Sequence, residues 1–121
     1  ILNAAYNDQA GVTAAFNLNV LTRINAELAT NLDPKHFLHH AFYNTEKGRI
    51  EMHLHSRFAQ TIYVNDQSFA LAANESIHTE NSYKYTTTEL QALAHEAGWH
   101  AKNSWQDEQG LFAVYYFSAT D

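Results

Sequence analysis

Apolar residues in the first part of the chain recur at helical spacing. Over residues 11–30 they return about every fourth position, which predicts an amphipathic helix. Three asparagines in this segment are poor helix formers, and we expect all three to face solvent: Asn17, Asn19 and Asn25. The apolar stripe that should pack on the core consists of Val12, Phe16, Val20, Ile24 and Leu28, widened by Leu21.

The middle of the chain alternates between apolar and polar positions, which is typical of strands. Asp33 and Pro34 first predict a short helix over 34–40. Strands are then predicted over 40–44, 49–58, 60–64, 69–73 and 75–85, with turns at 45–48 and 65–68. In the second strand Ile50, Met52 and Leu54 share one face, and Glu51, His53 and His55 share the other. In the last strand one face should carry Ser76, His78, Glu80, Ser82 and Lys84.

The last third predicts a helix followed by a hairpin. Threonines 86–88 can cap a helix over 86–97, and Gly98 suits the position just after its end. Strands are predicted over 99–106 and 111–118 around a glycine-containing loop. The whole pattern indicates an α+β fold with amphipathic helices on a mainly antiparallel sheet.

Composition narrows the possible functions. The chain has 121 residues, which predicts a single domain, and no cysteine, which excludes disulfides, thiolate metal sites and a cysteine nucleophile. A net charge of -6 with scattered basic residues disfavours nucleic acid and anionic membranes as partners. No apolar run approaches the ~20 residues that span a bilayer, and no secretion signal opens the sequence. We expect a soluble, cytoplasmic protein.

Familiar catalytic patterns do not occur in the sequence. The four glycines are too scattered for a nucleotide-binding loop, and no Gly-x-Ser-x-Gly motif occurs. His53 and His55 on one strand face, or His36 and His40 one helical turn apart, could hold zinc or copper. Because no recognised metal motif accompanies these pairs, we expect surface histidines and no metal.

Glu80 and Ser82 form the more specific candidate site. They stand two residues apart on one strand face, where a carboxylate accepts and a hydroxyl donates or accepts hydrogen bonds. Together they complement a neutral imidazole, which has one donor and one acceptor nitrogen. The alternative is an ordinary solvated strand face.

Three stretches carry a resemblance to a known family. They are residues 6–19 (YNDQAGVTAAFNLN), 48–54 (GRIEMHL) and 77–85 (IHTENSYKY). The chain resembles, from Tyr6 to about Phe117, the histidine-specific methyltransferases that depend on S-adenosylmethionine (SAM). Those enzymes trimethylate the α-amino group of L-histidine at the start of ergothioneine biosynthesis.

The resemblance implies two structural parts and an incomplete enzyme. Residues 1–85 would form the substrate-binding α+β domain, and residues 86–121 the last helix and β-hairpin of a Rossmann-like domain that is otherwise absent. SAM would be the methyl donor of the full-length enzyme, bound by a loop outside this chain. The chain would then be an inactive carboxy-terminal portion that binds histidine and self-associates through its exposed sheet edge.

The resemblance also assigns roles to single residues. It implies that Glu80 and Ser82 bind the imidazole, that Met52 packs near the ring, and that Tyr6 contacts the substrate carboxylate; it assigns no catalytic or donor-binding residue within the chain. Two alternatives remain open. One is a stand-alone module that binds a small polar ligand, and the other is a metal-binding domain that uses His53 and His55.

Overall fold

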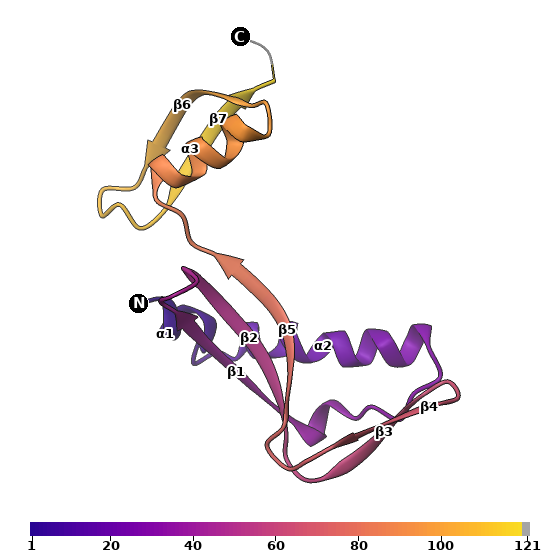
Figure 1. Ribbon diagram of the computed structural model, residues 1–121. Helices are drawn as coiled ribbons and strands as arrows, with labels where there is room; N and C mark the ends of the chain where they lie inside the picture. Colours follow the sequence, from indigo (N-terminus) through magenta and orange to yellow (C-terminus); the bar gives the residue numbers. More distant parts are fainter. Residues whose placement is uncertain (120–121) are drawn as a thin grey trace. The chain divides into compact units, whose positions relative to one another are not determined.

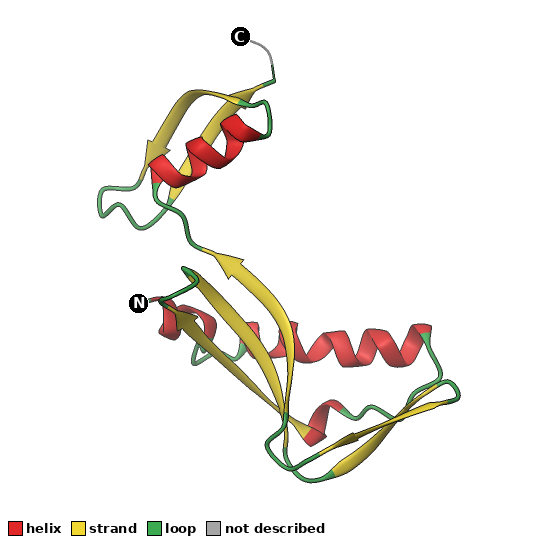
Figure 2. Cartoon of the chain, in the orientation of Figure 1, coloured by secondary structure: helices red, strands yellow, loops and turns green. Residues whose placement is uncertain are grey.

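A computed structural model describes residues 1–119, which form two compact units where length alone predicts one. The first unit spans Ile1–Lys84 and the second begins at Tyr85. Elements of both are labelled in Figure 1 and coloured by type in Figure 2. Within residues 1–119, no helix has the length and apolar content needed to cross a membrane.

The first unit places two helices on one face of a three-stranded antiparallel sheet (Figure 2). The sheet has the order β1–β2–β5, and β3 and β4 form a separate hairpin. The elements are α1 (Leu2–Tyr6), α2 (Val12–Glu27), the 3-10 turn η1 (Pro34–His36), β1 (Phe37–Asn44), β2 (Arg49–Ser56), β3 (Gln60–Val64), β4 (Gln67–Leu71) and β5 (Ser76–Tyr83).

The central strand β2 supplies the core, as its alternation predicts. Ile50 and Leu54 have no exposed surface, and Met52 is 2% exposed. Leu54 packs with residues of α2, β1 and β3, while Ile50 and Met52 pack beneath α1. Both helices therefore cover the face of β2 that the sequence marks as apolar.

The orientation of α2 differs from the predicted one. Val12, Phe16, Val20 and Leu28 are exposed, and the buried residues of the helix are Asn17 and Leu21. A row of residues spaced by four drifts around a helix of 3.6 residues per turn, so it cannot stay on one face over four turns. Leu21, with Leu18 and Ile24, forms the stripe that contacts the sheet.

The predicted helix over 34–40 is only one turn long. Asp33 accepts a hydrogen bond from the Lys35 amide, as a capping residue should, but η1 ends at His36. Strand β1 starts at Phe37, three residues before the predicted strand, because all eight of its residues pair with β2. The sequence pattern did not predict the short helix α1.

The second unit is a helix with a hairpin. It contains α3 (Thr87–Glu96), β6 (His100–Gln106) and β7 (Ala113–Ser118), and the two strands pair antiparallel. Thr86 and Glu89 form a reciprocal capping box, and Gly98 follows the helix with φ 83°, so both predicted helix boundaries are confirmed. The hairpin leaves large apolar side chains exposed, among them Trp105, Val114 and Tyr116.

Candidate functional site

A bulge at Thr79 shifts the alternation of side chains along β5, so His78 and Glu80 lie on opposite faces of the sheet. Glu80 pairs with Met52, whereas His78 pairs with His53, so Thr79 is an extra residue in the ladder. Cross-strand partners share a face, which places Glu80 and Ser82 on the helix-covered side with Met52. His78 lies on the opposite side. The prediction that His78 shares a face with Glu80 is therefore wrong, because the bulge shifts the alternation by one residue.

Asn17 links this bulge to α1. The Thr79 hydroxyl lies 2.6 Å from Asn17 Oδ1 and 2.9 Å from the Met52 carbonyl oxygen. Asn17 Nδ2 lies 3.0 Å from His39 Nδ1, and His39 Nε2 lies 2.8 Å from the Tyr6 carbonyl oxygen. Asn17 is only 3% exposed, so the expectation that it faces solvent is wrong. Its amide is buried because it satisfies polar groups on three other elements.

Tyr6, Ser82 and Lys84 form a triangle of hydrogen bonds on the helix-covered side. The Tyr6 and Ser82 hydroxyl oxygens are 2.8 Å apart. Lys84 Nζ donates to Tyr6 over 2.7 Å and to Ser82 over 2.8 Å, and it lies 4.7 Å from the Tyr6 ring centroid. The hydrogen bond from Lys84 lowers the pKa of Tyr6 below its ordinary value, and the bond from Ser82 adds to this effect.

The donors and acceptors of Tyr6, Ser82 and Lys84 determine which hydrogen bond remains available for a ligand. The lysine ammonium only donates, so both hydroxyl oxygens accept from it. One hydroxyl then donates to the other, and the second hydroxyl keeps a hydrogen for a third group. A phenol hydroxyl is a stronger donor than an aliphatic one, and Lys84 lowers the pKa of Tyr6 further, so the favoured arrangement has Tyr6 donating to Ser82. Ser82 then presents a donor outward.

Met52 and Glu80 lie beside this triangle. Met52 belongs to a buried cluster with Ala41 and Ile50, against which Tyr6 packs. Glu80, its cross-strand partner, is exposed and borders a hollow of about 200 Å³ lined largely by α2. The negative charge of Glu80 opposes the lowering of the Tyr6 pKa, so these side chains share one electrostatic environment.

The four site residues predicted from the sequence thus come from three elements, α1, β2 and β5. Tyr6 and Ser82 touch directly, Met52 lies beneath Tyr6, and Glu80 flanks Met52. Lys84 is the residue whose part in the site the sequence analysis did not recognise. Its position two residues after Ser82 on an alternating strand was the available signal.

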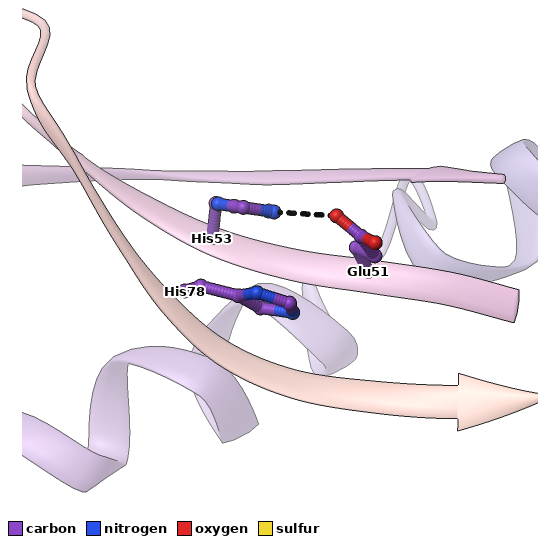
Figure 3. A group of neighbouring side chains, drawn as sticks. All are labelled: Glu51, His53 and His78. Carbon is purple, nitrogen blue, oxygen red and sulfur yellow. Dashed lines mark hydrogen bonds and ion pairs between the residues drawn. The ribbon is translucent and has the colours of Figure 1, made fainter. Parts of the chain in front are cut away.

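The opposite face of the sheet gathers a second polar group, Glu51, His53 and His78 (Figure 3). His53 Nε2 lies 3.2 Å from Glu51 Oε2, and the rings of His53 and His78 stack with centroids 4.4 Å apart. Sequence analysis paired His53 with His55 instead, but those ring centroids are 6.3 Å apart. The bulge at Thr79 brings His78 to His53, and nothing in the sequence pattern indicated it.

The electrostatics of this group are set by Arg49 and by burial. Arg49 binds Glu51 Oε1 through Nε at 2.9 Å and Nη2 at 2.7 Å, which lowers the pKa of Glu51 to about 2. Burial lowers the pKa of His53. At neutral pH the group therefore combines an ionised carboxylate with a neutral imidazole.

An apolar cavity of about 490 Å³ lies between α2, the β3–β4 hairpin and β5. Its walls are chiefly aliphatic, and the lining also includes His78 and Thr79 of β5. This cavity offers apolar burial but few polar groups that could orient a ligand.

Comparison with known proteins adds the following findings. The profile of a family described as "Histidine-specific methyltransferase, SAM-dependent" matches residues 1–119. The chain is 42% identical over 112 residues to a protein of Mycolicibacterium smegmatis named "Histidine N-alpha-methyltransferase". It is 39% identical over 112 residues to a protein of the same name from Mycobacterium tuberculosis. Each match covers 91% of this chain and 35% of the relative, so the chain spans about a third of the length of these relatives.

Proposed function

This chain belongs to the family of histidine-specific, SAM-dependent methyltransferases, and we propose that it is the carboxy-terminal portion of such an enzyme and supplies the surface that binds the amino-acid substrate. The observation that carries the proposal is the triangle of Tyr6, Ser82 and Lys84 beside Met52 and Glu80. The reaction proposed for the whole enzyme is methylation of the α-amino group of L-histidine, in agreement with the names of its relatives.

The methyl donor is proposed to bind outside the described residues. SAM sites in Rossmann-like domains use a glycine-rich turn between a strand and a helix. None of the four glycines here sits in such a turn; Gly11, for example, precedes α2 but follows the short helix α1. Residues 1–119 therefore lack the kind of turn that binds the methyl donor. The second unit, with α3 and the β6–β7 hairpin, is proposed to complete a donor-binding domain formed by other residues.

The substrate ring is proposed to bind between Glu80 and Ser82. The Glu80 carboxylate accepts a hydrogen bond from one ring N–H, and the Ser82 hydroxyl donates to the other nitrogen. Met52 provides an apolar, polarisable surface against the ring. Tyr6 lies next to Ser82 at the carboxylate end of the amino acid, where the positive charge of Lys84, held by its hydrogen bonds to Tyr6 and Ser82, attracts the carboxylate.

Positioning is the contribution that these residues make to the chemistry. Methyl transfer requires a neutral amine in line with the donor's methyl group, and fixing the distant imidazole restricts where the amine points. A site that hydrogen-bonds both ring nitrogens also rejects analogues without them, since its own polar groups would stay unpaired.

The experiment is a methylation assay of the full-length enzyme that contains this chain. Glu80→Ala should lower kcat/KM for histidine about ten- to a hundredfold, because a hydrogen bond to a charged group is worth about 1.5–3 kcal/mol. The affinity for SAM should stay unchanged. Glu46→Ala, in the exposed β1–β2 turn, is the matched control. Full histidine activity in Glu80→Ala would show that this face is only a solvated strand surface.

A further inference from the structure

We propose that Glu51, His53 and His78 form a binding site for a divalent transition-metal ion of the zinc type, on the sheet face opposite the proposed substrate residues. One ligand atom from each residue lies within 4.8 Å of the others. The set combines two imidazoles and one carboxylate from adjacent strands (Figure 3). This inference does not depend on the proposed substrate site.

Strand pairing brings the three side chains to one face. His53 and His78 are direct cross-strand partners, and Glu51 lies two residues before His53 on β2. In a tetrahedral zinc site with metal–ligand distances of about 2.0–2.1 Å, neighbouring ligand atoms lie about 3.3 Å apart. His53 Nε2 and Glu51 Oε2 are 3.2 Å apart, which is close to that separation, and the Nε2 hydrogen that now joins them is released to solvent when an ion binds.

Neighbouring groups hold these two ligands in place. Arg49 and Asn44 both bind Oε1 of Glu51, which leaves Oε2 directed at His53. The His53 ring stacks on Phe42 with centroids 5.5 Å apart, and its Nδ1 lies 3.4 Å from the Ser76 hydroxyl. Such outer contacts fix the orientation and tautomer of metal-binding histidines in proteins.

His78 is the ligand that must move. Its ring lies flat against that of His53, and its Nε2 is 2.7 Å from Asn81 Oδ1 and 3.2 Å from the Glu80 carbonyl oxygen. Because His78 is exposed, it can rotate and exchange these two contacts for the ion at little packing cost. The site is therefore half preorganised, with water completing the coordination.

The chemistry of the ligands selects the class of ion. Imidazole nitrogens suit zinc, nickel and copper, whereas magnesium and calcium prefer sets made only of oxygen. A set of two imidazole nitrogens and one carboxylate oxygen therefore favours an ion of the zinc type.

The test is calorimetric titration of the 121-residue chain with ZnCl₂ at neutral pH, repeated for two matched variants. Wild type should bind one Zn²⁺ per chain. His78→Gln should weaken the affinity at least about tenfold, and His53→Gln should do the same. The control is His55→Gln, on the same face of β2 but outside the ligand set, which should bind within about twofold of wild type.

Several results would overturn the proposal. The proposal is wrong if wild type shows no saturable binding of Zn²⁺, or if His78→Gln binds Zn²⁺ with the affinity of wild type. Equal losses in His55→Gln would place the ion elsewhere on the sheet. A loss in His95→Gln would place it at the His95–His100 pair of the second unit, whose ring centroids are 5.7 Å apart. Unfolding curves recorded without metal separate loss of a ligand from loss of the fold.

Discussion

Lys84 should control the hydrogen-bond direction at the proposed substrate site, and Lys84→Met tests this. Methionine keeps much of the length of the side chain but removes the ammonium that donates to both Tyr6 and Ser82. Without it, the pKa of Tyr6 should return toward its ordinary value. The preference for Tyr6 as the donor should then weaken, and Ser82 should present its hydrogen outward for a smaller fraction of the time.

The magnitude follows from the bonds that change. The variant loses no contact with the substrate ring itself, but it weakens the proposed hydrogen bond from Ser82 to that ring and removes the positive charge beside the substrate carboxylate. A typical hydrogen bond contributes about 0.5–1.5 kcal/mol, and the lost charge adds to this, so kcat/KM for histidine should fall at least about three- to tenfold in the full-length enzyme. Lys84→Arg keeps the charge and should restore part of the loss.

The assay combines kinetics with a direct measurement on Tyr6. Methylation of histidine gives kcat/KM, and ¹³C NMR of labelled tyrosine gives the pKa of the Tyr6 hydroxyl, which should rise in Lys84→Met. Lys47→Met, at an exposed lysine in the β1–β2 turn, is the control and should change neither quantity. An unchanged Tyr6 titration together with wild-type kcat/KM would refute the reasoning.

Four further outcomes are expected. Asn17→Leu should destabilise the chain by about 1–3 kcal/mol in urea unfolding, since it leaves buried partners unpaired; wild-type stability would contradict the network. Burial depresses the pKa of His53 below its unfolded value of 6.5. The free energy of unfolding should therefore be highest above pH 6.5 and decline as pH falls below that value, because the folded state binds the proton less readily. An unfolding midpoint that stays flat between about pH 8 and 5 would count against this. The chain alone should bind no SAM in calorimetry. Micromolar affinity would show that the donor site lies within the chain, contrary to the proposal. The exposed apolar hairpin β6–β7 should cause dimerisation, which a monomer in light scattering at high concentration would disprove.

Local patterns predicted much of the secondary structure. The apolar face of β2, the turn before it and the caps of α3 all depend on neighbouring residues, such as Thr86 with Glu89 and the glycine after the helix. These features follow from period-two alternation and from capping chemistry, which act within a few residues. The α+β character of the chain was predictable for the same reason.

Features that depend on partners distant in sequence were not predictable. The buried face of α2 is decided by polar groups on β1, β2 and β5, which recruit Asn17 in place of Phe16. The roles of Tyr6, Met52, Glu80 and Ser82 come from the family resemblance and stay a prediction. Spacing alone suggested that Glu80 and Ser82 share a face and complement an imidazole, with an ordinary solvated strand face as the alternative.

The bulge at Thr79 explains why β5 contributes residues to two different polar groups, one on each face of the sheet. His78 and Glu80 are two residues apart and would share a face in a regular strand, but the extra residue sends them to opposite sides. Glu80 and Ser82 thereby join Met52 and Tyr6, while His78 joins His53 and Glu51. Since Asn17 binds the Thr79 hydroxyl, a change at this buried asparagine should disturb both faces together, although its hydrogen bonds go to Thr79, His39 and the His53 carbonyl and not to Glu80 or the His78 ring. A site on one face of the sheet is in this way structurally tied to the group on the other.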